Sequence, residues 1–261
     1  MKTLIVIPAR QASTRFPGKP MALVSGKSLL SRVWQIAKTV RGIDQVVIAT
    51  DHEKIQKHAE SFGAEVVFTR ADCENGTERA YDAARKIIPR PDIVLNLQGD
   101  AVLTPPWIIQ SLVNEMLRSP EIQMATPATR LNWEKYDEFV KSKSEGRVSG
   151  TLVVFDKNYN ALYFSKGLIP FLRDRELKEP PIYRHIGLYA YRYSALEKYV
   201  SLSMTPLEQA EKLEQLRALE NGIPIKIVPV DYQGRTHWSV DNPEDIQKVE
   251  EIILREGELV R

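Results

Sequence analysis

LIVIPARQASTRFPGKP, residues 4 to 20, is the stretch that decides the fold of this chain. Its first four residues, Leu4 to Ile7, are all apolar and mostly β-branched. Such a run is typical of a strand that is buried on both faces of a parallel sheet. Pro8 ends the run, and the polar residues after it, with Gly18 and Pro20 among them, indicate a loop. The chain is thus predicted to open with a buried strand that leads into a long polar loop.

This loop is strongly basic, because Arg10, Arg15 and Lys19 fall within ten residues. A triphosphate is held by flexible cations, guanidinium forks and closely approaching backbone N–H groups. Gly18 permits such a close approach. The spacings of the Walker loop and of the GxGxxG dinucleotide fingerprint are both absent. A solvated basic loop is the alternative, but its place after the first buried strand favours an anion site.

Further short apolar runs alternate with helical patterns along the first hundred residues. Strands are predicted at Val46–Ala49, Val66–Phe68 and Ile93–Leu97. This alternation predicts an α/β fold with a mostly parallel sheet flanked by helices. Ligands of such sheets bind beyond the carboxyl ends of the strands. Three polar motifs follow predicted strands, namely PAR…GKP, TDHE (residues 50–53) and QGD (residues 98–100).

The second half of the chain is richer in strand patterns. Strands are predicted at Leu152–Phe155, His185–Tyr191 and Ile225–Val230, and a helix over Glu208–Asn221. A last helix follows Pro243. We expect a single domain over residues 1–261, with a β-rich segment at roughly 148–195.

Composition limits the classes of partner. A net charge of +2 over 261 residues, 43% of them apolar, argues against a surface devoted to nucleic acid or membrane. The single cysteine, Cys73, cannot form an intramolecular disulfide, which fits a reducing compartment. The apolar run at the N-terminus is too short for a signal sequence. We therefore expect a cytoplasmic protein that binds neither nucleic acid nor membrane.

Two acidic residues are candidate metal ligands. Asp100 follows the predicted strand Ile93–Leu97, and Asp241 follows another predicted strand far away in the sequence. Mg²⁺ favours one or two carboxylates, with its other ligands from phosphate and water. Asp241 or Asn242 serves equally well as the N-cap of the last helix, with Pro243 at or near its first position.

At this point the chain resembles the 3-deoxy-manno-octulosonate (Kdo) cytidylyltransferase family, in blocks that occur in order: PARQASTRFPGKP, ATDHE, TRADCENGTER, LNLQGD, ALYFSKGLIPFLRDR, YRHIGLYAYR, PLEQAEKLEQLRALENG and VDNPEDI. The resemblance covers about residues 2 to 250. It implies a Rossmann-like sugar-nucleotidyltransferase fold with a β-rich dimerisation segment, a homodimer and Mg²⁺. It also implies transfer of CMP from CTP to a 3-deoxy-ulosonic acid, with release of pyrophosphate, for bacterial surface polysaccharide and lipopolysaccharide synthesis.

The resemblance also implies roles for individual residues. Catalysis falls to Arg10, Arg15, Lys19 and Asp100. Metal binding falls to Asp100 and Asp241. The implied nucleotide-binding residues are Ala9, Arg10, Ser13, Lys19, Arg70, Gly76, Thr77, Arg79 and Gln98, with Glu78 beside them. The implied sugar-binding residues are Gln98, His185, Tyr189 and Glu214.

Two departures from the family pattern fall where the sugar acid is expected. The family usually reads QGDEP, whereas this chain has Ala101 and Val102 after Asp100. The stretch EGRVSGTLVVFD, from Glu145, replaces a segment that usually contains Asn-Pro. A different ulosonic acid, such as the 8-amino relative, therefore stays open as the substrate. So does a homologue that binds nucleotide with weakened catalysis.

Overall fold

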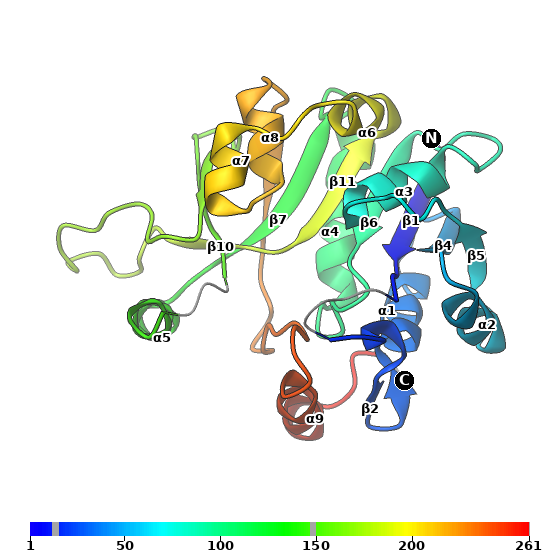
Figure 1. The fold of residues 1–261 in the computed structure, drawn as a ribbon. Coiled ribbons are helices and arrows are strands. Elements are labelled where there is room, and N and C mark those ends of the chain that lie inside the picture. The colour runs from blue at the N-terminus through cyan, green and yellow to red at the C-terminus, as the bar shows by residue number, and fades with distance from the viewer. Residues whose placement is uncertain (12–15, 147–149, 261) are drawn as a thin grey trace.

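Strand β1 (Thr3–Pro8) lies inside a parallel group of strands in the computed structural model of the chain, which describes residues 1–11, 16–146 and 150–260. It pairs in parallel with β4 (Gln45–Thr50) on one side and with β6 (Ile93–Leu97) on the other. Strand β5 (Glu65–Phe68) continues the group beyond β4. The side chains of residues 4–7 are fully buried. The predicted buried strand and the parallel sheet around it are confirmed (Figure 1).

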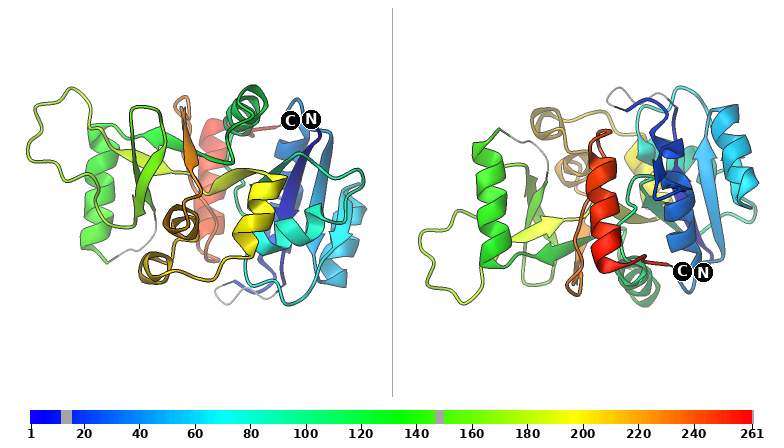
Figure 2. Two further views of the ribbon diagram at one scale, coloured as in Figure 1. Left: turned by 90° about the horizontal axis from the view of Figure 1, so that it is seen from above. Right: turned by 90° about the horizontal axis from the view of Figure 1, so that it is seen from below.

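Helices cover both faces of this group, as the two views of Figure 2 show. One face packs against α1 (Leu29–Lys38), α2 (Glu53–Ser61), α4 (Pro106–Arg118) and α9 (Asp245–Glu256). The other packs against α3 (Gly76–Ala84), α6 (Tyr193–Val200) and α8 (Gln215–Glu220), with α7 (Pro206–Glu211) beside α8. Except for the short α7, each of these helices buries two or more apolar side chains, as an amphipathic helix does. Among the described residues, no helix is long and apolar enough to cross a membrane.

Beyond β6 the sheet becomes largely antiparallel. Its remaining strands, in spatial order, are β11 (Leu188–Arg192), β7 (Met124–Arg130), β10 (Tyr183–His185), β8 (Leu152–Phe155) and β9 (Ala161–Ser165). Strand β12 (Ile225–Val230) pairs in parallel with β7, and α5 (Trp133–Ser144) lies at the far side of this half (Figure 1). The short elements η1 (Lys19–Met21), β2 (Leu23–Val24) and β3 (Lys27–Ser28) follow the basic loop. The β-rich segment thus extends the same sheet.

Two expected elements are each divided into two. The strand expected over His185–Tyr191 is interrupted at Ile186 and Gly187, because β10 pairs with the end of β7 and with β8, whereas β11 crosses to β6. The helix expected over Glu208–Asn221 breaks at Lys212, which adopts left-handed backbone angles with φ of 54°. The two short helices are fastened by an ion pair of 2.7 Å between Arg217 Nη2 and Glu208 Oε1.

The start of the last helix also differs from the expectation. Helix α9 begins at Asp245, so Asp241 and Asn242 are not its N-cap. Instead, the Asp245 carboxylate accepts hydrogen bonds from the backbone N–H groups of Asp241 and Asn242, each at 2.8 Å. Helix α3 ends at Ala84, although the helical pattern of the sequence runs from Glu78 to Ile88. Elements α4, β7 and α5 were not predicted.

Two glycines ahead of β8, Gly146 and Gly150, differ in the room that a side chain would have. Gly146 and Gly150 both have positive φ, of 78° and 81°. A Cβ at Gly150 would lie 2.6 Å from the ring of the buried Phe139, whereas one at Gly146 meets nothing within 4 Å. Gly150→Ala should therefore lose about 1–3 kcal/mol more stability than Gly146→Ala, because only the former overpacks a core. Urea denaturation of both variants measures the difference, and equal losses would contradict the packing described.

Candidate active site at the carboxyl ends of the parallel strands

Strands β1, β4 and β6 all point toward one edge of the sheet, and a pocket of about 180 Å³ opens there. The basic loop and the QGD loop meet at this pocket, as the parallel sheet predicted. The first residues of α3 join them, so the pocket lies at a helix N-terminus, which favours anions. The lining residues are Pro8, Ala9, Arg10, Lys19, Pro20, Asn75, Gly76, Arg79, Gln98, Gly99 and Asp100.

An ion pair joins the two loops across the pocket. Lys19 Nζ lies 2.5 Å from Asp100 Oδ2, and the two side chains are 15% and 28% exposed. Gly18 makes this geometry accessible, because its φ of 72° turns the chain into η1, where Lys19 is the first residue. A partly buried cation and a carboxylate, both facing one pocket, are groups that bind phosphate and a hard metal ion respectively.

Two glycines keep the floor of the pocket open. A Cβ at Gly76 would lie 3.2 Å from the terminal atoms of Gln98 and 3.3 Å from the Pro8 ring. A Cβ at Gly99 would lie 3.1 Å from the carbonyl oxygen of Pro8. Helix α3 and the QGD loop can therefore approach the end of β1 only because these positions lack side chains.

The TDHE motif acts indirectly, through Arg79. This arginine is 3% exposed and donates hydrogen bonds to Asp51 Oδ2 at 3.0 Å and to Thr69 Oγ1 at 2.6 Å. Asp51 thus fixes the arginine that lines the pocket.

The other two arginines expected at the nucleotide differ in position. Arg10 lines the pocket and donates a hydrogen bond to the Glu74 carbonyl oxygen at 3.3 Å. Arg70, expected at the nucleotide, faces another hollow.

That second hollow lies between α3 and α6 and has a volume of about 630 Å³. Arg70 and Glu78 line it, and the Arg70 Nε lies 3.4 Å from Asp82 Oδ1. The structure therefore separates these two residues from the pocket that contains Lys19 and Asp100.

A chain of polar side chains leads from the pocket into the sheet. Gln98 Nε2 donates to Asn96 Oδ1 at 3.4 Å, and Asn96 Nδ2 donates to Thr77 Oγ1 at 3.1 Å. Thr77 Oγ1 in turn lies 3.0 Å from both carboxylate oxygens of Glu214. Asn96 and Thr77 are fully buried. The chain links a residue expected at the nucleotide with one expected at the sugar.

The expected sugar-binding side chains lie near one another but are mostly buried. Tyr189 donates to Gln215 Oε1 at 3.0 Å, and its ring lies 5.4 Å from that of His185. His185 Nε2 and Thr126 Oγ1 are 2.8 Å apart, and burial lowers the pKa of His185 to about 3, so the imidazole is neutral. Burial raises the pKa of Glu214, although hydrogen bonding from Thr77 opposes this shift.

Other expected residues lie elsewhere. Asp241 is in the loop between β12 and α9 and does not line the pocket, so its metal role stays a prediction. Ser13 and Arg15 fall outside the described residues. Within the ranges that the structure covers, no three His, Cys, Asp or Glu side chains are grouped so as to hold a metal ion.

Sequence reasoning missed four side chains that organise the site: Asp51, Asn96, Thr126 and Gln215. Asn96 had a local signal, because it is a polar residue inside the apolar run LNL. Asp51 lay in the TDHE motif without an assigned partner. Thr126 and Gln215 gave no signal in the sequence, because only the folded sheet brings their side chains within hydrogen-bond distance of His185 and Tyr189.

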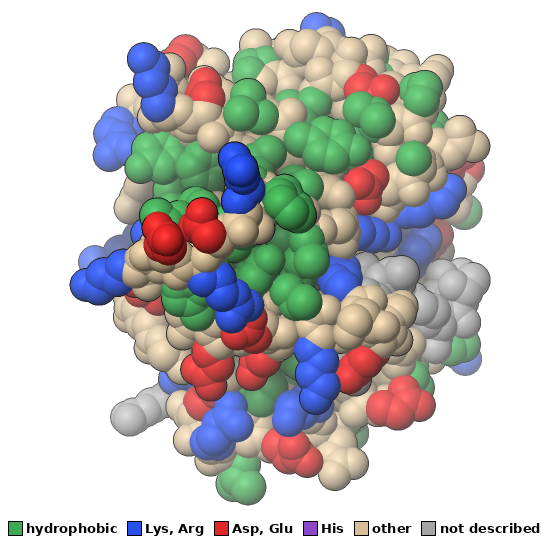
Figure 3. All heavy atoms as spheres, turned by 90° about the vertical axis from the view of Figure 1, so that its left-hand side faces the viewer, with side chains coloured by type: hydrophobic (Ala, Val, Ile, Leu, Met, Phe, Trp, Pro, Cys, Tyr) green, Lys and Arg blue, Asp and Glu red, His purple; other side chains and the backbone are tan. Residues whose placement is uncertain are grey.

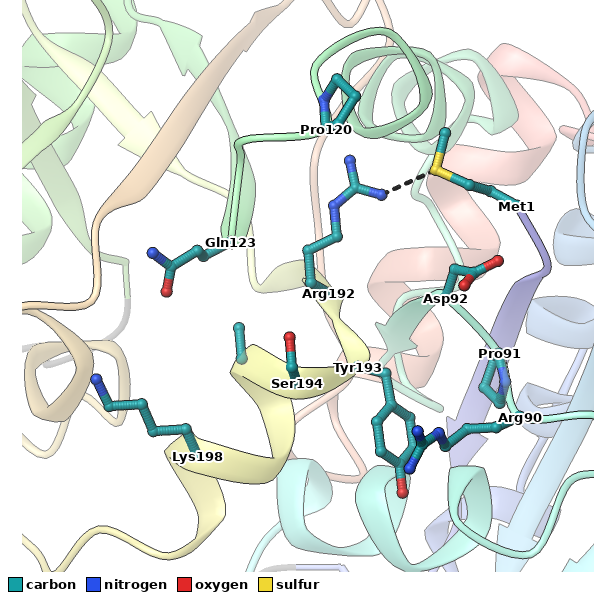
Figure 4. A pocket seen from close by; sticks show the side chains of 11 residues that line it. Met1, Arg90, Pro91, Asp92, Pro120, Gln123, Arg192, Tyr193, Ser194 and Lys198 are labelled. Carbon is teal, nitrogen blue, oxygen red and sulfur yellow. Dashed lines mark hydrogen bonds between the residues drawn. The ribbon is translucent and has the colours of Figure 1, made fainter.

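A hollow of about 620 Å³ lies at the opposite edge of the sheet and is shown in Figure 4. Two of its three basic side chains, Arg192 and Arg90, have partners within the fold. Arg192 donates to the carbonyl oxygens of Met116, Ser119 and Ile122, and Arg90 lies over the Tyr193 ring with its Cζ 4.8 Å from the centroid. Arg192 thus satisfies carbonyl groups in and after the last turn of α4, and Arg90 covers an aromatic ring. We therefore assign the hollow a structural role.

Comparison with known proteins identifies relatives of this chain. The cytidylyltransferase family matches residues 4–227. A 3-deoxy-manno-octulosonate cytidylyltransferase of Maricaulis maris is 52% identical, over all of both chains. An 8-amino-3,8-dideoxy-manno-octulosonate cytidylyltransferase of a Shewanella species is 39% identical and covers 96% of this chain and 98% of its own.

Among solved structures, CMP:2-keto-3-deoxy-manno-octonic acid synthetase complexed with CTP superposes with a TM-score of 0.86 at 33% identity, over 98% of this chain and 100% of that one. Sequence and fold thus agree over nearly the whole length. The chain belongs to the cytidylyltransferase family, and within it to the 3-deoxy-manno-octulosonate cytidylyltransferases.

Proposed function

We propose that this protein transfers CMP from CTP to the anomeric hydroxyl of a 3-deoxy-ulosonic acid and releases pyrophosphate, as a step in bacterial surface polysaccharide synthesis in the cytoplasm. The hydroxyl oxygen forms a bond to the α-phosphorus, the bond from this phosphorus to the bridging oxygen breaks, and the hydroxyl proton passes to solvent. The observation that carries the proposal is the Lys19–Asp100 pair, at 2.5 Å, in a pocket that Arg10 and Arg79 also line.

The nucleotide half of the site is built for a leaving polyphosphate. Lys19 and Arg10 bring positive charge to the pocket, and the first turn of α3 adds backbone N–H groups. These groups would neutralise charge that develops on the departing pyrophosphate. Catalysis of this kind depends on positioning and charge stabilisation, and no side-chain base has to be assigned.

The residues present fit Mg²⁺. The Asp100 carboxylate is a hard oxygen donor at the pocket, and Mg²⁺ commonly takes one or two protein carboxylates together with phosphate and water ligands. We infer that Asp100 holds the ion, and the family resemblance would add Asp241, which does not line the pocket. Mg²⁺ supplies positive charge at the phosphates and lowers the pKa of the attacking hydroxyl when bound. With such an ion at Asp100, Lys19 would be available to pair with the phosphates.

The departure at Ala101 and Val102 leaves the nucleotide pocket intact. Val102 is 3% exposed and packs in the core, and the Ala101 N–H donates to the Gln98 carbonyl oxygen at 3.1 Å. The loop therefore holds Asp100 in place without the usual acidic residue after it. Because Lys19, Arg79 and Asp100 all line one pocket, we favour a working enzyme over a homologue that only binds nucleotide.

We also propose that the protein is a homodimer. Strand β9 ends the sheet order, and edge strands are ready sites for association. Leu162 on β9 is 62% exposed, and Leu168 and Phe171 in the following segment are 39% and 86% exposed. Figure 3 shows apolar side chains gathered on this side of the molecule. A second copy of the chain is the partner that would cover them.

Pyrophosphate release tests the reaction. With CTP and Mg²⁺, the protein should turn over Kdo with a higher kcat/KM than 8-amino-Kdo, since the Kdo-specific relative is the more similar of the two. A reversed preference would assign the 8-amino acid as substrate. Lack of turnover with every ulosonic acid, from protein that folds and binds CTP, would show that the chain only binds nucleotide.

Asp100→Asn should lower kcat by at least about 100-fold, because one strong electrostatic contact at the transferring group is lost. The fold should survive, as a thermal unfolding scan can verify. Asp174→Asn, in an exposed segment, is the matched control and should keep normal turnover. Near-normal activity of Asp100→Asn would exclude a metal-binding role for this carboxylate.

Leu162→Asp should convert the dimer to a monomer, because a charge in a buried apolar contact is costly. Leu254→Asp is the matched control, since Leu254 is 90% exposed on α9, away from β9. Sedimentation velocity reports both. A wild-type monomer, or a Leu162→Asp dimer as stable as the wild type, would refute this interface.

A further inference from the structure

Arg79 lies in the wall of the pocket and is held there by acceptors that come from two strand ends. It is 3% exposed, belongs to α3 and lines the pocket. Its Nη2 donates to Asp51 Oδ2 at 3.0 Å, and its Nη1 donates to Thr69 Oγ1 at 2.6 Å and to the Arg70 carbonyl oxygen at 3.4 Å. A guanidinium has five N–H groups. Within the described ranges, these three bonds leave two N–H groups for a ligand.

The parallel pairing of β4 with β5 places Asp51 and Thr69 side by side. Asp51 directly follows β4 and Thr69 directly follows β5, and the last residues of the two strands, Thr50 and Phe68, are register partners. The Thr69 N–H donates to the Thr50 carbonyl oxygen at 2.8 Å, which extends the pairing by one step. The two strand ends therefore present a carboxylate and a hydroxyl together to the arginine on α3.

The end of β4 is also tied to the start of the basic loop. The Ala9 N–H donates to the Ala49 carbonyl oxygen at 2.8 Å, two residues before Asp51. Ala9 lines the pocket, whereas Asp51 does not. Asp51 thus lies behind the pocket wall, where it contacts the arginine and not the space that a ligand would fill.

Asp51 supplies the negative charge that a buried guanidinium requires. A cation that is removed from water without a counter-charge is costly. Among the described residues that line the pocket, Asp100 is the one acid, and it pairs with Lys19. An acid behind the pocket therefore neutralises Arg79, while Asp100 stays with Lys19. Each of these two cations has a carboxylate of its own.

We propose that Asp51 is a positioning residue for CTP, which holds the Arg79 guanidinium so that its remaining N–H groups bind acceptor oxygens of the nucleotide; this inference rests on the proposed function. A guanidinium is planar, so partners on one side set the direction of the donors on the other. Without Asp51 the group would keep Thr69 but lose its counter-charge. The TDHE motif then contributes to CTP binding through Asp51, and not to binding of the sugar acid.

Calorimetry with CTP and Mg²⁺, together with steady-state kinetics for both substrates, tests this inference. Asp51→Ala should raise the Kd and the KM for CTP by about 10-fold, as expected for loss of a charged hydrogen bond. The KM for Kdo and kcat should stay close to the wild-type values. Asp51→Asn keeps an acceptor but not the charge, so its effect should be smaller, and Asp51→Glu should restore part of the affinity that Asp51→Ala loses.

The effect of Asp51 should depend on Arg79. Arg79→Gln should weaken CTP binding by itself, and Asp51→Ala should add little in that background, because the group that Asp51 positions is no longer there. A carboxylate that only ties β4 to α3 would lower the unfolding temperature without a change confined to CTP. Thermal unfolding of all variants separates these two roles, and Asp51→Asn carries the comparison if Asp51→Ala does not fold.

Glu258→Gln is the matched control. Arg32 is 5% exposed and pairs with Glu258 Oε2 at 2.6 Å, so this variant also removes the charge that a buried arginine faces. Neither residue lines the pocket, and CTP affinity should equal that of the wild type.

Two results would overturn the inference: wild-type CTP affinity in Asp51→Ala, or an equal loss from Asp51→Ala with and without Arg79. Folded wild-type protein that binds CTP but turns over no ulosonic acid would instead refute the proposed function. The two failures are distinct, because calorimetry measures CTP binding without the sugar.

Discussion

The contact between Lys19 and Asp100 is the interaction on which the site depends. It joins the loop after β1 to the loop after β6, and the parallel register of these strands brings the two loops to one edge. Gly76 and Gly99 allow the surrounding backbone to close around the pocket. In this pocket, Lys19 and Asp100 can each pair with one of two partners. Lys19 neutralises Asp100 now and can neutralise phosphate, while Asp100 can exchange the ammonium for a metal ion.

The two halves of the site are assembled in different ways. The nucleotide half comes from short segments that directly follow strands. Its residues therefore lie within, or close to, the sequence motifs that predict them. The sugar half comes from distant segments. Thr77, Asn96 and Glu214 form one hydrogen-bonded chain although they lie on α3, on β6 and ahead of α8. Raised and lowered pKa values occur in this second half, where Glu214 and His185 are buried among aromatic rings.

This division explains how much could be predicted from the sequence. Residues 4–7 were recognised as a strand because burial on both faces leaves an unbroken apolar run, and residues 93–97 because only Asn96 interrupts theirs. The breaks at Gly187 and Lys212 were missed, since they depend on which strand or helix the chain meets next. Asp241 lies in the loop between β12 and α9 and does not cap this helix, whose N-cap is Glu244.

A crystal structure of the protein with CTP and Mg²⁺ tests the central claim most directly. If the pocket between Lys19 and Asp100 receives the triphosphate, Lys19 Nζ will lie about 3 Å from a phosphate oxygen, and the Asp100 carboxylate will have turned from Lys19 to the metal. CTP bound elsewhere, with the Lys19–Asp100 contact intact, would contradict the account.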